Sequence, residues 1–189
     1  MANFFRVKMN YETVNPENGE LSKKSTCTLI EGVNYYDAEM SSMKFAKHFN
    51  LDGTDGFDYD IVKMKMGCLL VDTNNAFINT PTDEDDELNG LCFVGHSGNN
   101  FEPQSEGAGL FKVAISYKTL ESKKRKETLH IFTKDIDTAT QIGNKYIARY
   151  LDTSDGAIIN IKLEPQTALL ISKEIYETAK EIYNIVCKL

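Results

Sequence analysis

An internal repeat constrains the fold of this chain more than any other feature of its sequence. Residues 5–13 align with residues 111–119 without a gap, and apolar side chains alternate with polar ones in both segments. Alternation of this kind is the period of a strand that buries one face. The matching apolar residues are Phe5, Val7, Met9 and Tyr11 in the first copy and Phe111, Val113, Ile115 and Tyr117 in the second. Both copies are therefore expected to open with the same strand.

A turn and a returning strand are expected after each opening strand. Residues 15–19 contain the Pro, Asn and Gly that a chain reversal favours, and residues 121–126 make a shorter, charged turn. The returning strands alternate again. In our alignment Cys27 and Leu29 match Leu129 and Ile131. Each copy should thus begin with a β-hairpin.

The next segment of each copy has the period of an amphipathic helix. Its apolar residues recur three and four positions apart, at Tyr35, Ala38, Phe45, Ala46 and Phe49 and at Ile136, Ala139, Tyr146, Ile147 and Tyr150. Asn34 or Asp37 is expected to cap the first helix, and Asp135 or Asp137 the second. Each helix is followed by an Asp- and Gly-containing turn, at 52–56 and 152–156, and by an apolar stretch, at 59–66 and 157–163. We expect these two stretches to be third strands.

The repeat divides the chain into four parts. They are a first ββαβ unit (1–72), an acidic linker (73–109), a second ββαβ unit (110–171) and a C-terminal helix (172–189). The linker contains a block of like charge at 80–87, and its apolar run at 91–95 is a candidate for a short edge strand. The expected fold class is α+β, a tandem pair of ββαβ units with small, mainly antiparallel sheets and a C-terminal helix.

The C-terminal helix carries a narrow apolar stripe with two flanking tyrosines. Two interpretations remain open: the stripe packs on its own domain, or it docks into a neighbouring subunit. Tyrosine favours interfaces because its ring is apolar and its hydroxyl is polar. The candidate interface residues are Ile175, Tyr176, Ala179, Ile182, Tyr183 and Val186.

A cluster of basic residues lies near the turn of each hairpin. The candidate basic patch consists of Lys23 and Lys24 in the first copy and Lys123, Lys124, Arg125 and Lys126 in the second. These residues are suited to binding phosphate or an acidic partner, or they simply keep an exposed hairpin soluble. The net charge of −7 opposes non-specific binding to nucleic acid, so nucleic acid is a candidate partner that overall charge does not favour.

No pattern typical of catalysis, cofactor binding or metal binding is found. Residues 95–99 resemble a hydrolase nucleophile turn around Ser97, but the last glycine of that motif is replaced by Asn99. The three histidines fall in different elements, and His130 is expected to face solvent from a strand. The acidic residues 83–87 are either a solvated linker, a site for a divalent cation or an imitation of nucleic-acid phosphates. We therefore predict a protein that is not an enzyme and needs no cofactor.

The cellular setting is predicted from two absences in the sequence. No apolar run reaches the roughly 18 residues that cross a bilayer, and the first residues lack the apolar core of a signal peptide. The four cysteines include no close pair, so free buried thiols are expected rather than a zinc or redox motif. The missing membrane-crossing run and signal peptide predict a cytoplasmic protein without membrane contact.

The hairpin and helix patterns also resemble a known family. The similar residues are Phe4–Lys8, Tyr11, Glu12, Gly19, Lys23 and Lys24 in the first copy and 111–113, Tyr117 and Lys118 in the second. The patterns are similar to an uncharacterised family of short proteins of Bacteroidales bacteria and their tailed phages. This resemblance implies a phage or mobile-element setting, in the bacterial cytoplasm or the virion, and no catalytic residue.

Two functions follow as hypotheses. The first is a non-enzymatic phage protein that acts through contacts with other protein subunits, including copies of itself, as a virion component or an assembly accessory. The alternative is a nucleic-acid-associated accessory protein of phage or mobile-element DNA metabolism that binds through the basic hairpins.

Overall fold

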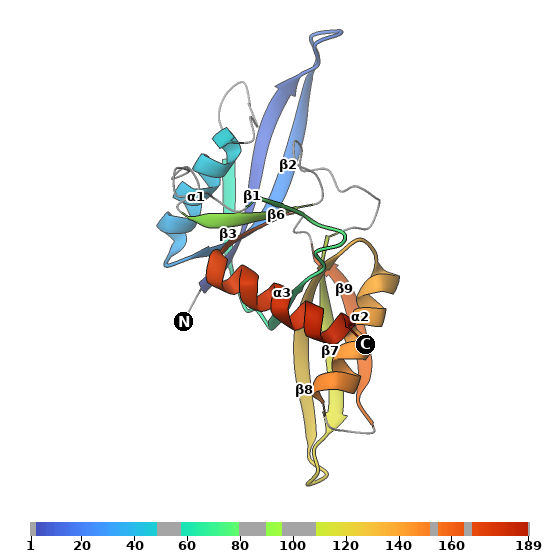
Figure 1. Ribbon diagram of the computed structural model, residues 1–189. Coiled ribbons are helices and arrows are strands. Elements are labelled where there is room, and N and C mark those ends of the chain that lie inside the picture. The colour runs from blue at the N-terminus through green and yellow to red at the C-terminus, as the bar shows by residue number, and fades with distance from the viewer. Residues whose placement is uncertain are drawn as a thin grey trace.

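The structure is a computed structural model that describes residues 3–48, 58–79, 90–95, 109–151, 155–164 and 168–188. Within these residues the fold is α+β, with three helices and ten strands (Figure 1). The first half of the chain contains β1 (Asn3–Val14), β2 (Leu21–Gly32), α1 (Tyr35–His48), β3 (Asp58–Met64) and β4 (Cys68–Val71). Two strands follow, β5 (Phe77–Asn79) and β6 (Leu91–Gly95). The second half contains β7 (Gly109–Lys118), β8 (Lys124–Thr133), α2 (Ile136–Tyr150), β9 (Ala157–Glu164), β10 (Ala168–Ser172) and α3 (Lys173–Cys187).

The expected order of two strands, a helix and a third strand is present in both halves. Polar side chains cap the helices where the sequence indicates. The Asn34 side chain accepts a hydrogen bond from the Asp37 amide at 2.9 Å, and the Asp135 side chain accepts one from the Thr138 amide at 2.7 Å. Each bond satisfies an amide that has no partner inside its own helix.

The two halves exchange their fourth strands, which the sequence did not predict. The first sheet has the order β3-β1-β2-β10-β6-β5, and the second sheet has the order β4-β8-β7-β9. Strand β4 of the first half therefore pairs, in parallel, with β8 of the second half. Strand β10 of the second half pairs, also in parallel, with β2 of the first half. Each sheet is thus completed by a strand from the other half of the chain.

The two hairpins and the exchanged strands have matching registers. Phe5 lies opposite Ile30 in the first sheet, as Phe111 lies opposite Ile131 in the second. The exchanged strands keep the match, because Leu170 pairs with Ile30 and Leu70 pairs with Ile131. Phe5 and Phe111 are both buried beneath the helix-covered face of their own sheet.

The alignment of the returning strands was wrong by one residue. Leu129 lies opposite Val113, and the residue opposite Val7 is Thr28 rather than Cys27. Leu29 accordingly faces away from α1. Both Leu29 and Ile30 are fully buried, because both faces of β2 are covered at this point. The alternation of apolar and polar residues therefore could not show which of the two residues faces the helix. An alignment error of one residue places each side chain of the strand on the wrong face of the sheet.

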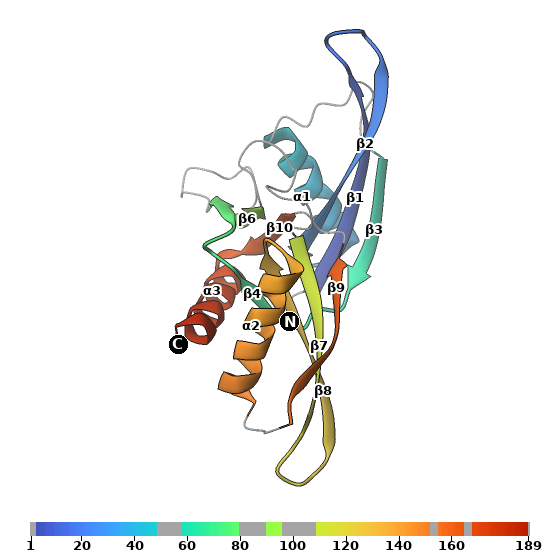
Figure 2. The same cartoon turned by 90° about the vertical axis from the view of Figure 1, so that its right-hand side faces the viewer.

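The apolar core consists of three clusters. One lies between the first sheet and α1, and another lies between the second sheet and the pair α2 and α3. The third joins the two sheets and includes Leu29 and Leu169 from the first sheet and Leu69, Leu110 and Phe132 from the second. The two halves therefore share a central core. In Figure 2, α2 and α3 lie side by side, and the two long hairpins project from opposite ends of the molecule.

The segment expected to be a linker contributes two strands to the first sheet. Leu91–Gly95 was expected to be an edge strand, but it forms β6, which pairs with β10 on one side and β5 on the other. Four of its five residues are buried, and a strand covered in this way is suited to the interior of a sheet. The acidic block at 80–87 and the loop at 97–108 lie outside the described residues.

Two buried threonines lead to a prediction about stability. The Oγ1 atoms of Thr26 and Thr28 are buried and have no hydrogen-bond partner among the described residues. Thr28→Val should increase the free energy of unfolding by about 1 kcal/mol, because it replaces an unsatisfied hydroxyl with a methyl group of similar size. Thr133→Val is the matched control. The Thr133 hydroxyl donates a hydrogen bond to the Asp72 carboxylate at 2.8 Å, so Thr133→Val should lower the free energy of unfolding. Urea titration measures the unfolding free energy of both variants. Equal effects of the two substitutions would contradict this prediction.

Candidate functional site

The candidate basic residues do not form one patch. Lys23 and Lys24 lie on β2, whereas Lys123, Lys124, Arg125 and Lys126 lie at the β7–β8 hairpin, and the two hairpins point in opposite directions (Figure 1). All six side chains are exposed. A single ligand bound at one hairpin would not contact the other.

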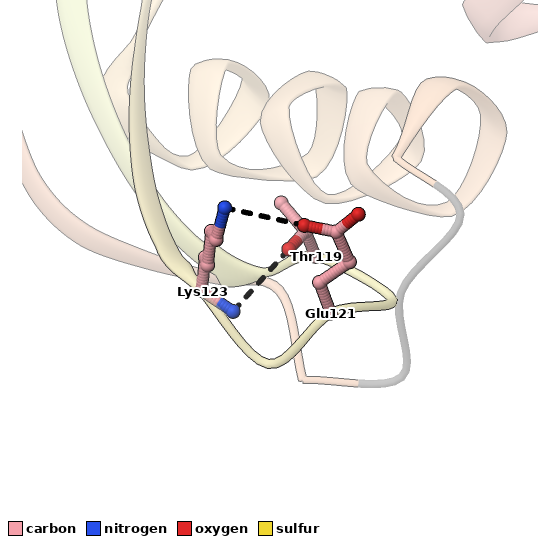
Figure 3. A network of polar contacts seen from close by, with 3 residues as sticks. All are labelled: Thr119, Glu121 and Lys123. Atoms are coloured by element: carbon pink, nitrogen blue, oxygen red, sulfur yellow. Dashed lines mark hydrogen bonds and ion pairs between the residues drawn. The ribbon is translucent and has the colours of Figure 1, made fainter.

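The β7–β8 turn is closed by its own polar contacts. The Lys123 Nζ lies 3.3 Å from the Glu121 carboxylate, and the Lys123 amide donates to the Thr119 hydroxyl at 3.3 Å (Figure 3). The Thr119 amide also donates to the Lys123 carbonyl at 2.9 Å. Because both charged side chains are well exposed, the ion pair adds little stability. The contacts of Lys123 are therefore made within the turn, and Glu121 neutralises its charge there.

The remaining basic residues of this hairpin point to opposite sides of the second sheet. Arg125 lies opposite Tyr117, on the side that α2 covers. Lys124 and Lys126 lie on the other side, because successive residues of a strand alternate between faces. They are joined there by Lys112 and Lys118 from β7 and by Lys162 from β9. We call these five exposed residues the lysine face: Lys112, Lys118, Lys124, Lys126 and Lys162.

Like charges lie directly opposite one another on the lysine face. Lys118 pairs in register with Lys124, and Lys112 pairs with Lys162. Like charges in direct register destabilise a sheet, and a bound anion would relieve that repulsion. The residues between the lysines are small or polar, namely Ala114, Ser116, Thr128 and Asn160. An anionic chain could therefore approach the sheet closely.

Acidic residues occur only at the two ends of this face among the described residues. Glu164 is buried near the central core, opposite Leu110. At the other end, the Asp155 carboxylate accepts a hydrogen bond from the Lys118 amide at 3.4 Å. The middle of the lysine face is therefore positive.

The charge of the whole chain conceals this local excess. Residues 109–164 contain ten basic residues (Lys and Arg) and seven acidic residues (Asp and Glu). The rest of the chain contains 11 basic residues and 21 acidic residues. The equivalent face of the first sheet is mixed, because Lys8 lies opposite Asp60 and Asn10 lies opposite Asp58. The positive face is thus specific to the second half.

His130 belongs to the same face but is buried, which corrects the expectation that it faces solvent. It lies opposite Lys112, and its Nδ1 accepts a hydrogen bond from the Gly67 amide at 3.0 Å. Burial, with a smaller contribution from Lys112, lowers the pKa of His130 to about 4. The β3–β4 connection covers it. The histidine is therefore neutral at pH 7 and adds no charge to the lysine face.

The chain itself covers most of the candidate interface on α3. Tyr176, Ala179, Tyr183 and Val186 are buried in its own core clusters. The Tyr183 hydroxyl also accepts a hydrogen bond from the Asn74 side chain at 3.3 Å, and burial and hydrogen bonding to Asp72 raise its pKa. Only two of the six residues, Ile175 and Ile182, remain partly exposed, and both line a pocket. These two side chains remain accessible to another protein subunit. A subunit contact through α3 stays a prediction.

The residues of the weak catalytic motif cannot be placed, since His96 and Ser97 lie outside the described residues. Within the described stretches, no three His, Cys, Asp or Glu side chains lie together as metal ligands would. The four cysteines are free thiols, and Cys92 is the buried one while the others are partly buried.

Sequence reasoning missed Lys112, Lys118 and Lys162 as site residues. The alternation of β7 already placed Lys112 and Lys118 on the face away from Phe111. Their significance depends on which strands lie beside β7, and the order β8-β7-β9 brings the lysines of three strands together.

Comparison with known proteins found no matching family model, no matching curated protein and no matching solved structure. In the part of the chain that the structure describes, no helix combines the length and the apolar composition needed to cross a membrane.

Proposed function

We propose that this protein is a non-enzymatic binding protein that holds the phosphate backbone of nucleic acid against its lysine face. The observation that supports this function is the row of exposed lysines on three adjacent strands, two pairs of which lie in direct register. Lysines that contact phosphates release counterions from the nucleic acid, and this release supplies most of the affinity of sequence-independent binding.

The composition of the lysine face indicates contact with phosphates rather than with bases. Its central residues are Ala114, Ser116, Thr128 and Asn160, and no aromatic ring lies among them. Proteins that bind single strands through their bases use aromatic side chains for stacking. Binding should therefore depend on charge and show little sequence preference. The resemblance to proteins of Bacteroidales phages suggests an accessory role in phage or mobile-element DNA metabolism in the bacterial cytoplasm.

Charge reversal on the lysine face is the direct test. In fluorescence anisotropy with a labelled DNA duplex and the matching single strand, Lys112→Glu combined with Lys162→Glu should weaken binding at least roughly tenfold, because phosphate contacts become repulsive. The affinity of the unmodified protein should fall steeply between about 50 and 200 mM salt.

The matched control reverses two charges on the other hairpin. Lys23→Glu combined with Lys24→Glu changes the net charge equally but leaves the lysine face intact, so binding should persist. An equal loss of DNA affinity in the two double variants would show that binding depends only on the net charge of the protein. Absence of binding to either DNA at low salt would rule out the proposed function.

The second candidate function is protein contact, as a virion component or an assembly accessory that binds other subunits or itself. It is favoured by the partly exposed Ile175 and Ile182 beside an open pocket. A mass measurement in solution separates the two functions. An oligomer that dissociates when Ile182 becomes Glu would support protein contact, whereas a monomer that binds DNA would support the first proposal.

A further inference from the structure

A pocket of about 820 Å³ lies where three segments of the chain meet. Its walls come from the start of β1, from the connection between β3 and β4, and from one side of α3. The pocket therefore lies at the point where the chain passes from the first sheet to the second. Its volume is within the range of small-molecule sites, about 300 to 1,000 Å³.

The walls of the pocket are mostly apolar. Phe4, Met64, Met66 and Ile175 pack against the central core but are only partly buried, and Leu69 lies in the core beneath them. Methionine side chains adapt to ligands of irregular shape because they are unbranched and flexible. The pocket thus offers an adaptable apolar surface that the described residues do not fill.

Among the described residues, the charged groups that line the pocket are all positive. Lys63 and Lys65 are exposed at its edge, and no Asp or Glu is among the described lining residues. The thiol of Cys68 also lines it, and burial, together with the nearby Glu127, raises the pKa of that thiol. Cys68 therefore contributes no negative charge. A ligand that complements this pocket needs an apolar body and one anionic group.

We propose that the pocket binds a small amphipathic acid, an apolar chain that ends in a carboxylate. The chain lies against Met64, Met66 and Ile182, and the carboxylate contacts Lys65 or Lys63. This site is separate from the proposed nucleic-acid site, because none of the lysine-face residues lines the pocket.

Calorimetric titration with decanoate and with decanol tests both parts of the proposal. Decanoate should bind, and decanol should bind roughly threefold to fivefold more weakly because it lacks the charge that the exposed lysines complement. Lys65→Glu should weaken decanoate binding to a similar extent and leave decanol binding unchanged. Thr178→Trp should prevent binding of both, since Thr178 is an exposed lining residue and the larger ring would fill the pocket without disturbing the core.

The controls separate this proposal from the proposed function. Lys112→Glu should leave decanoate binding intact, whereas Thr178→Trp should leave DNA binding intact. Decanol that binds as tightly as decanoate would overturn the role of the charge. Decanoate binding that is absent, or unaffected by Thr178→Trp in a variant with normal thermal unfolding, would overturn the site itself.

Discussion

Gly67→Ala is expected to lower the free energy of unfolding by about 3 kcal/mol or more, because the added carbon has no room. A Cβ atom at this position would lie 2.0 Å from the Thr128 carbonyl oxygen and 2.7 Å from its carbonyl carbon. Both are backbone atoms of β8, so no flexible side chain can move aside. The connection would have to shift away from β8, and the hydrogen bond from the Gly67 amide to His130 would be lost.

Gly19→Ala provides the control for this prediction. Gly19 has a φ of +71°, but a Cβ there would meet no atom within 4 Å. Gly19→Ala should lower the free energy of unfolding by about 1 kcal/mol, because alanine is strained at a positive φ. Urea unfolding followed by circular dichroism measures both changes. A Gly67→Ala variant as stable as Gly19→Ala would show that the close approach to Thr128 is relieved at little cost.

The second large effect is a loss of stability in mild acid caused by His130. Its pKa in the folded protein is about 4, below the ordinary value of 6.5, because it is buried opposite Lys112. The unfolded chain therefore takes up a proton first as the pH falls. The stabilising effect of the neutral histidine is complete above pH 6.5 and is lost between pH 6.5 and 4. The total loss should be about 3 kcal/mol.

The His130→Asn variant isolates this effect from the titration of carboxylates. Asparagine keeps an acceptor near the Gly67 amide and does not titrate. The difference in unfolding free energy between the two proteins should become smaller as the pH falls from 6.5 towards 4, because only the histidine protein loses stability through this group. A difference that stays constant over this range would contradict the low pKa.

Local elements could be predicted because their patterns depend on near neighbours in the sequence. Phe111, Val113 and Ile115 alternate with polar residues, and β7 spans them. The cap of α2 at Asp135 likewise follows from spacing within a few residues. The apolar stripe of α2 is confirmed only in part, because Ile136 and Tyr150 at its two ends are exposed. The third strands at Asp58–Met64 and Ala157–Glu164 also lie where the apolar stretches after the two turns indicated.

The exchange of β4 and β10 could not be predicted in this way. Both strands are short and largely buried, and their apolar runs do not alternate. A continuous apolar run indicates burial on two sides but does not identify the partner strand. Pairing with the other half depends on the central core, where Leu69 and Leu169 meet side chains from both sheets.

The two hairpins, the third strands and the helices follow from local sequence patterns, whereas β4, β5 and β10 were not predicted. Three features depend on strand order and packing: Lys112, Lys124 and Lys162 lie on one surface, His130 is buried, and most of the α3 stripe is covered by its own chain. The difference comes from the range over which the interactions act. Alternation and capping act over a few residues, whereas strand order, burial and charge clustering depend on segments that are distant in the sequence and close together only in the folded protein.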